Sequence, residues 1–209
     1  MSYLFEDPME NFRELMKPLQ DLAWTETPFD QNFCDRLPNG KAYDFDKIKD
    51  RVCAFRSKAT KSLRSADAFL SVNEDSGAKY YFIDFKNQKV GNIQSVKDQG
   101  KNELIQKAFD SLLVMAMTFG RNVSMKEIQE HSVFIVVYPK QDFSVRFLEV
   151  LNQCADSRPL WNLDKLISNG FYQSVHTISD EDFSELSLKS NLFCESRREI
   201  RRADLTIAG

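Results

Sequence analysis

The apolar run at 132–138 constrains the fold more than any other feature of the chain. Its residues are Ser-Val-Phe-Ile-Val-Val-Tyr, and Pro139 follows directly. Successive residues of a strand point to opposite faces of a sheet, so a continuous apolar strand needs cover on both faces. The run therefore predicts a central strand in an α/β protein whose sheet is flanked by helices.

The segments around this strand are predicted from their periodicity and turn residues. Residues 66–72 and 79–86 have strand-like patterns, and Asp75-Ser76-Gly77 between them is typical of a turn, which favours an antiparallel hairpin. A long helix is predicted at 101–119, where apolar residues repeat at helical spacing and Gly120 follows. The other predicted elements are helices at 9–23, where Pro18 is a point of interruption, at 44–60, 142–155 and 163–168 and after Ser179, a short helix capped by Ser124 and Glu127, an edge strand at 172–178 and a loop at 25–42. Together they predict a mixed sheet.

The composition is that of an ordinary globular chain. Its 209 residues are 42% hydrophobic and include 17 phenylalanines, enough for the core of one domain. No apolar stretch approaches the roughly 20 residues that span a bilayer, and the acidic N-terminus is unlike a signal peptide. We predict a cytoplasmic protein without membrane contact, with an N-terminal helical and loop extension at 1–40, an α/β domain at 41–195 and a basic tail at 196–209.

Three residues at one end of the predicted hairpin are the candidates for chemistry. Asp84 and Lys86 lie two apart at the end of the second strand, so their side chains point to the same face. Asp67 lies near the start of the first strand, and antiparallel pairing brings it beside them. Two carboxylates that converge in this way form a hard-oxygen site suited to Mg²⁺ or Mn²⁺.

A metal ion at such a site supports the hydrolysis of phosphodiester bonds. The ion polarises a phosphoryl oxygen and lowers the pKa of a bound water molecule. Lys86 can orient the attacking water or stabilise charge that grows on the phosphorus oxygens. The simpler alternatives are a surface ion pair between Asp84 and Lys86 on an edge strand, and a turn or capping role for Asp67.

The order of these motifs resembles the PD-(D/E)xK nuclease superfamily. The matching segments are Arg64-Ser65-Ala66-Asp67, then Ile83-Asp84-Phe85-Lys86-Asn87, then the helix with Asp110-Ser111-Leu112-Leu113. The stretch 61–138 is also similar to small bacterial proteins of this type. The resemblance implies a restriction-endonuclease-like fold, with Asp67 and Asp84 as metal ligands and Lys86 as the catalytic lysine. Many relatives act as dimers, so a homodimer is one expectation.

The chain departs from the pattern of this superfamily at two points. Ala66 stands where the family has a proline, which is a common change. Many members also carry a glutamate on the first helix, whereas the helix predicted at 44–60 offers only aspartates: Asp44, Asp46 and Asp50.

A basic stretch suggests how nucleic acid would reach the site. Residues 41–64 carry eight lysines and arginines against three aspartates, although the net charge of the chain is −3. The candidate contacts to nucleic acid are Lys58, Lys61, Arg64, Gln106 and Lys107. The alternatives are solvated helix surfaces for these residues and, for the whole chain, a nuclease-fold binding module without catalytic activity.

Overall fold

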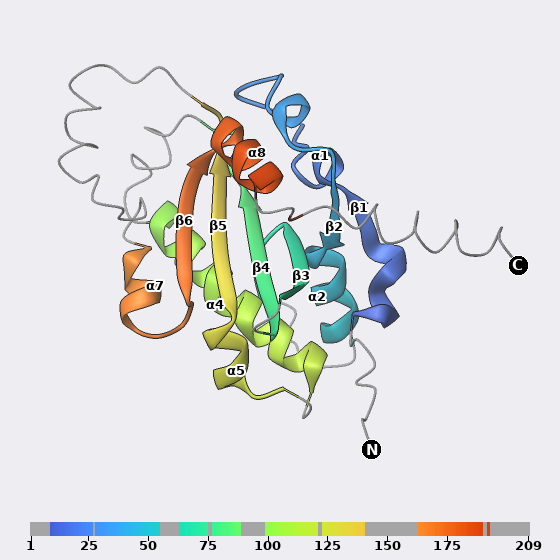
Figure 1. Cartoon of the computed structure of the whole chain (residues 1–209), viewed down its shortest axis with the longest axis vertical. Helices are drawn as coiled ribbons and strands as arrows, with labels where there is room; N and C mark the ends of the chain where they lie inside the picture. The colour runs from blue at the N-terminus through green and yellow to red at the C-terminus, as the bar shows by residue number, and fades with distance from the viewer. Residues whose placement is uncertain are drawn as a thin grey trace, which may run out of the picture.

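The computed structural model describes residues 9–26, 28–54, 63–74, 77–88, 99–120, 123–140, 163–189 and 192. They form an α/β fold around one six-stranded mixed sheet, in which the strands follow one another in sequence order (Figure 1). The first four strands pair antiparallel, and the last three run parallel. The strands are β1 (Met16–Pro18), β2 (Lys41–Asp44), β3 (Ala68–Glu74), β4 (Gly77–Phe85), β5 (Ser132–Tyr138) and β6 (Ser174–Ser179).

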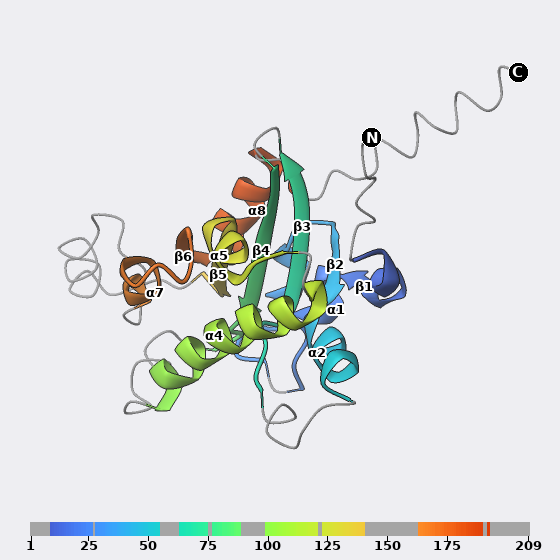
Figure 2. The ribbon, with the colours of Figure 1, turned by 90° about the horizontal axis from the view of Figure 1, so that it is seen from below.

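Helices cover both faces of this sheet. The longest helix and the last helix lie on opposite sides of it (Figure 2). The helices are α1 (Leu19–Leu22), α2 (Phe45–Cys53), α4 (Gln99–Phe119), α5 (Met125–Glu130), α7 (Asp164–Ser168) and α8 (Asp180–Lys189), with 3-10 turns η1 (Glu10–Leu15) and η2 (Cys34–Arg36).

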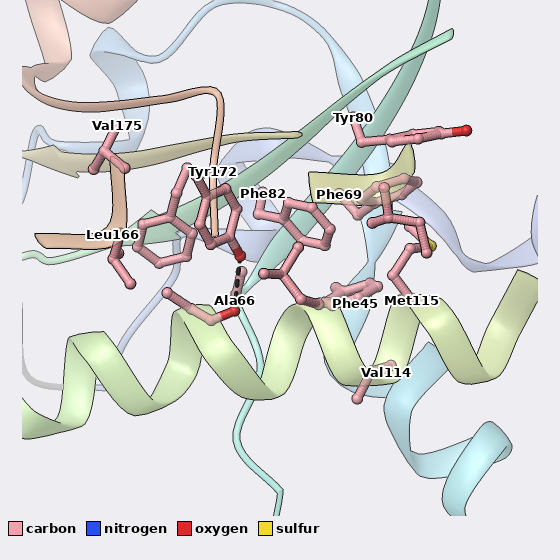
Figure 3. Close-up of a cluster of buried hydrophobic side chains, with 14 of the residues drawn as sticks. Phe45, Ala66, Phe69, Tyr80, Phe82, Val114, Met115, Leu166, Tyr172 and Val175 are labelled. Carbon is pink, nitrogen blue, oxygen red and sulfur yellow. Dashed lines mark hydrogen bonds between the residues drawn. The ribbon is translucent and has the colours of Figure 1, made fainter. Parts of the chain in front are cut away.

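Two cores follow from the alternation of side chains along the strands. On the α4 face, aromatic rings dominate: Phe69 stacks on Phe45 at 5.4 Å between ring centroids, and Phe82 meets Tyr172 edge to face at 5.9 Å (Figure 3). The buried hydroxyl of Tyr172 donates to the carbonyl of Ala108 in α4 at 2.7 Å. The opposite face buries alternate strand residues, such as Ile83, against α1, η2 and α8.

The structure confirms the elements on which the site prediction depends. Strands β3 and β4 form the predicted antiparallel hairpin, and β5 is a buried inner strand between β4 and β6. The predicted long helix is α4, which ends at Gly120 with a φ of +62°. The Ser124 and Ser179 hydroxyls accept hydrogen bonds from the third residue that follows each of them, as predicted for caps.

The N-terminal part differs from the prediction. Instead of one helix at 9–23, the chain forms η1, the short strand β1 and the one-turn helix α1. The cause is Pro18, because the residue before a proline is driven into the extended region and proline itself is tolerated on an edge strand. The predicted loop at 25–42 was partly wrong, since it contains η2 and the start of β2. The helix predicted at 142–155 lies outside the described residues.

Residues before position 40 also belong to the cores of the sheet. Strand β1 extends the sheet through β2, and Leu19, Ala23, Phe33 and Leu37 are buried in the core on the α8 face. The predicted basic tail at 196–209 lies outside the described residues. Within the described ranges, no helix is both long and apolar enough to cross a membrane.

Candidate functional site

The hairpin brings the three predicted site residues together. The backbone N–H of Asp67 donates to the carbonyl of Ile83 at 3.0 Å, which continues the β3–β4 pairing by one residue and sets Asp67 beside the end of β4. Asp84 and the residue two positions later, Lys86, face the same side, as the period of a strand requires. That side is the one covered by α4.

A fourth residue, Lys107 of α4, completes the cluster. Its ammonium lies 2.6 Å from Asp84 Oδ1 and 3.1 Å from Asp67 Oδ1, so it bridges the two carboxylates. The ammonium of Lys86 lies 2.7 Å from Asp84 Oδ2. The other oxygen of Asp67, Oδ2, accepts a hydrogen bond from the backbone N–H of Phe85 at 2.7 Å. Two acids and two ammonium groups therefore share one small volume.

Helix α4 also fixes the chain that leads into Asp67. The hydroxyl of Ser111 accepts a hydrogen bond from the N–H of Ala66 at 2.9 Å, and Asp110 Oδ2 accepts one from the N–H of Arg64 at 2.9 Å. Both acceptors lie one turn of helix beyond Lys107. The same helix thus supplies a charge to the site and anchors its first strand.

The neighbouring charges give the two carboxyl groups opposite shifts in pKa. Burial and the nearby charge of Asp84 raise the pKa of Asp67 to about 6, against the opposing attraction of the two lysines. Burial also raises the pKa of Asp84, but the positive charges of Lys86 and Lys107 outweigh it, so its pKa is lowered. The pKa of Lys107 is raised, because its two carboxylate partners outweigh the effect of burial. One proton therefore belongs preferentially to Asp67.

One atom of the cluster has an unused bonding capacity. Asp84 Oδ2 is buried and accepts no hydrogen bond from the described residues, since its contact with Lys86 is an ion pair without hydrogen-bond alignment. A buried carboxylate oxygen with a vacant lone pair is costly in a protein interior. It is also the kind of hard donor that Mg²⁺ and Mn²⁺ bind.

The donor set fits a metal ion only in part. Asp67 and Asp84 would supply two ligand carboxylates, and the described residues contain no group of three or more acidic, histidine or cysteine side chains placed to hold a metal. Mg²⁺ is commonly held by one or two carboxylates, with water and substrate oxygens completing its shell. Two carboxylates are therefore enough for an ion of this kind.

The cluster opens into a hollow in the surface. A cavity of about 250 Å³ is lined by Asp67, Lys86 and Lys107 together with Trp24 and Asn87. A wider hollow of about 490 Å³ adjoins it, because Asp67 and Trp24 line both. The wider hollow is also lined by Asp44 at the end of β2 and by Asp46 and Asp50 of α2. Trp24 itself is 67% exposed, which is unusual for a side chain of this size.

The predicted contacts to nucleic acid are distributed over several places. Arg64 is exposed and pairs with Glu103 at 3.1 Å, and Gln106 is exposed on α4. Lys58 and Lys61 lie outside the described residues. Lys107 is not the surface residue that the sequence suggested, because it is held between Asp67 and Asp84 with only 15% of its side chain exposed. The sequence held one signal of this inward position. Lys107 lies three residues after Leu104 and four before Ser111, so the three residues share one face of the helix, and the other two are buried.

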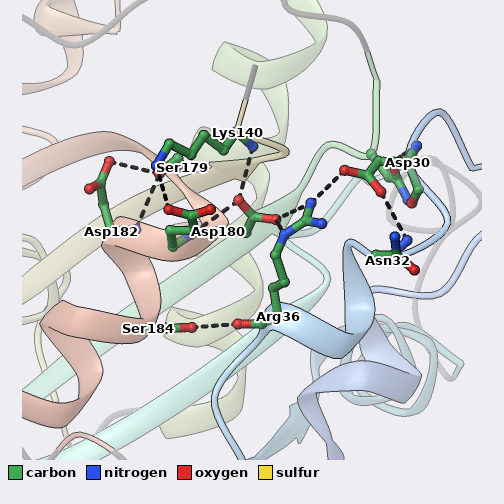
Figure 4. Close-up of polar contacts among 10 residues, drawn as sticks. Asp30, Asn32, Arg36, Lys140, Ser179, Asp180, Asp182 and Ser184 are labelled. Carbon is green, nitrogen blue, oxygen red and sulfur yellow. Dashed lines mark hydrogen bonds and ion pairs between the residues drawn. The ribbon is translucent and has the colours of Figure 1, made fainter. Parts of the chain in front are cut away.

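A second polar cluster lies on the side of the sheet that α8 covers (Figure 4). Arg36 pairs with Asp30 and donates through Nε to Asp180 Oδ2 at 2.6 Å. Asp180 Oδ1 accepts from the backbone N–H groups of Lys140 at 2.9 Å and Glu181 at 3.0 Å.

This second cluster also reaches the end of β4. The side chain of Asn87, the residue after Lys86, exchanges two hydrogen bonds of 2.9 Å with the backbone of Asp30. Because Arg36 holds Asp30, the cluster anchors the chain just beyond Lys86. The segment 30–36 therefore holds in place the residue that follows Lys86.

Comparison of the chain with protein-family models, with curated proteins and with solved structures gives no match. The resemblance to the PD-(D/E)xK superfamily therefore depends on the motif itself. The site has to be interpreted from its own geometry and charge.

Proposed function

We propose that this chain is a metal-dependent nuclease with a restriction-endonuclease-like fold, in which Asp67 and Asp84 hold Mg²⁺ or Mn²⁺. The observation that carries the proposal is the buried Asp84, whose Oδ2 accepts no hydrogen bond from the described residues and whose carboxylate shares the ammonium of Lys107 with Asp67. Two acids gathered in a largely buried place at the end of a strand are expensive unless they are paired or bind a ligand. A divalent cation is the ligand that suits these oxygens.

Each residue of the cluster has a role in this chemistry. When bound, the metal ion would polarise a phosphoryl oxygen and make a bound water molecule more acidic. Asp67 and Asp84 would hold the ion, and the N–H of Phe85 fixes one oxygen of Asp67, which leaves the other for the site. Lys86 lines the cavity and orients the water or stabilises negative charge on the phosphate oxygens.

As part of this proposal, we infer a polymeric substrate that extends beyond the cavity. About 250 Å³ is less than the roughly 300–1,000 Å³ of a typical small-molecule site. A cavity of this size suits one phosphodiester with part of its sugar. The exposed indole of Trp24 lines the cavity and offers a stacking surface for an unpaired base. We therefore favour single-stranded nucleic acid, or a strand end, as the substrate.

A specific observation also favours the alternative of a binding module without activity. Lys86 and Lys107 already neutralise the two carboxylates, so the charges of the cluster balance without a cation. A module of this kind would bind nucleic acid, and neither metal ions nor Lys86 would matter for a reaction. The two proposals differ in what a cleavage assay would show.

The test is cleavage of labelled single- and double-stranded DNA and RNA, with Mg²⁺ and with EDTA. We expect metal-dependent cleavage that Lys86→Met lowers by about 10²–10³-fold, since a preorganised charge at the phosphate contributes on that scale. The matched control is Lys126→Met, because Lys126 is highly exposed on α5 and should leave the rate unchanged. Cleavage that survives EDTA or Lys86→Met contradicts the mechanism. Binding without cleavage supports the inactive module.

A further inference from the structure

Lys107 occupies the position between the carboxylates that a cation would take. Its Nζ lies within 3.1 Å of one oxygen of Asp67 and within 2.6 Å of one oxygen of Asp84. A metal ion that joined the two carboxylates would need the same oxygens. The ammonium and the metal ion therefore compete for one place.

The charges of the cluster make the competition unavoidable. Two carboxylates face two ammonium groups, so the cluster is neutral as it stands. A divalent cation added without any movement would give four positive charges against two negative ones in a largely buried space. Repulsion between like charges in such a space is strong, because little water screens them. The ion can enter only if an ammonium leaves.

Lys107 is the group that can leave. Its head group and Lys86 both line the cavity of about 250 Å³, so an exit toward that cavity exists. A lysine is a point charge on a flexible four-carbon stem, and it can take a new direction without moving α4. The ammonium still needs a new partner, since leaving two carboxylates for empty space is costly. A phosphate group in the cavity would be such a partner.

We propose that Lys107 is an internal counter-ion that transfers from the carboxylates to the substrate phosphate when the metal ion binds. The inference rests on the proposed function, because it assigns a regulatory role at the same metal site. It predicts that metal ion and phosphate ligand bind with positive coupling. The metal ion alone binds weakly, and each ligand raises the affinity for the other by the same factor.

The test is calorimetric titration of Mn²⁺ into the full chain, alone, with saturating thymidine 5′-monophosphate, and with thymidine. Thymidine has the same base and sugar but no phosphate, so it isolates the contribution of the phosphate. We expect the dissociation constant for Mn²⁺ to fall about tenfold with the monophosphate and to stay unchanged with thymidine. This measurement needs no variant, so it does not depend on whether a substitution is tolerated.

Two variants then assign the coupling to Lys107. Lys107→Met removes the ammonium, and it should bind Mn²⁺ alone about tenfold more tightly than the wild type and lose most of the coupling. Lys107→Arg keeps a positive charge there and should keep metal binding weak. Unfolding curves of each variant in EDTA check that the fold persists.

The titrations distinguish a failure of the counter-ion proposal from a failure of the proposed metal site. Wild-type binding of Mn²⁺ that is equally tight with and without the monophosphate, or equally tight in Lys107→Met, overturns the counter-ion role and leaves the metal site standing. Absence of Mn²⁺ binding in the wild type and in Lys107→Met, at any ligand concentration, overturns the metal site itself. Binding that appears only in Lys107→Met, or only with the monophosphate, supports both.

Discussion

The two polar clusters of this protein each enclose a fully buried aspartate, but they satisfy it in different ways. Both oxygens of Asp180 accept hydrogen bonds, from two backbone N–H groups and from the guanidinium of Arg36. Asp84 is paired only with the ammonium groups of two lysines, and its Oδ2 accepts no hydrogen bond from the described residues. The guanidinium is a rigid fork, whereas an ammonium is a mobile point charge.

This difference separates a structural brace from a site that can exchange ligands. The Asp180 cluster joins η2 to the N-terminus of α8 and is complete without any added group. The Asp84 cluster borders a cavity, holds two carboxylates at one place and has one oxygen that accepts no hydrogen bond from the described residues. Burial of a charge therefore does not identify a functional site by itself. The two clusters differ in whether hydrogen-bond donors of the protein satisfy both oxygens of the buried carboxylate.

The same change made in each cluster should have unequal effects on stability. Arg36→Met leaves Asp180 buried and without its charged partner, and we expect a loss of about 3 kcal/mol in the free energy of unfolding. Lys107→Met leaves Asp84 paired with Lys86, and Asp67 can take up a proton, so we expect a loss of about 1.5 kcal/mol, the lower end of the range for a hydrogen bond to a charged group. Urea unfolding at pH 6 in EDTA measures both. Equal losses of unfolding free energy in Arg36→Met and Lys107→Met would contradict the proposed difference between the two clusters.

The raised pKa of Asp67 predicts a stability that falls as the pH rises. Its folded-state pKa of about 6 exceeds the ordinary value of 3.8, so the folded state binds the proton more tightly than the unfolded state. The stabilisation is complete below pH 3.8 and is lost as the pH rises through 6. Asp67→Asn imitates the protonated form. It should raise the free energy of unfolding by about 3 kcal/mol at pH 8, by about half as much at pH 5, and by little below pH 3.8.

Asp30→Asn is the control for this pH dependence, and it belongs to the other cluster. Hydrogen bonding to Arg36 lowers the pKa of Asp30 despite its partial burial, so its charged form stabilises the fold above pH 3.8. That stabilisation is lost only as the pH falls below this value. Asp30→Asn should therefore destabilise the protein to a similar extent at pH 8 and pH 5. Thermal unfolding at the two pH values in EDTA compares the variants, and a gain from Asp67→Asn at pH 5 as large as at pH 8 would contradict this account.

The smallest expected effect concerns Trp24, which belongs to neither cluster but lines the cavity beside one of them. Trp24→Ala should raise the KM for a single-stranded oligonucleotide about tenfold with little change in kcat, because a stacked base contributes about 1–3 kcal/mol. Trp24→Phe should restore part of the affinity. Phe29→Ala removes another exposed aromatic ring that lines neither hollow and should leave the KM unchanged. A KM that is insensitive to Trp24 would remove the stacking role.

The sequence was most informative where neighbouring segments pair. The hairpin of β3 and β4 is local, its turn residues are distinctive, and its period of two brought Asp67, Asp84 and Lys86 to one face as predicted. The bridging position of Lys107 was not predicted, because it depends on how α4 crosses the sheet. The pairing of Arg36 with Asp180 spans 144 residues and leaves no local pattern to detect. Strand β1 was hidden by an apolar spacing that also fits a helix.

The most direct test of the central claim is a calorimetric titration of Mn²⁺ into wild type, Asp84→Asn and Asp180→Asn, each with saturating thymidine 5′-monophosphate. The two variants make the same change at a fully buried aspartate, one in each cluster. We predict that Asp84→Asn abolishes the binding of Mn²⁺, whereas Asp180→Asn retains the wild-type dissociation constant. Equal binding in the two variants, or its loss in both while their unfolding curves remain cooperative, would contradict a metal site at Asp84.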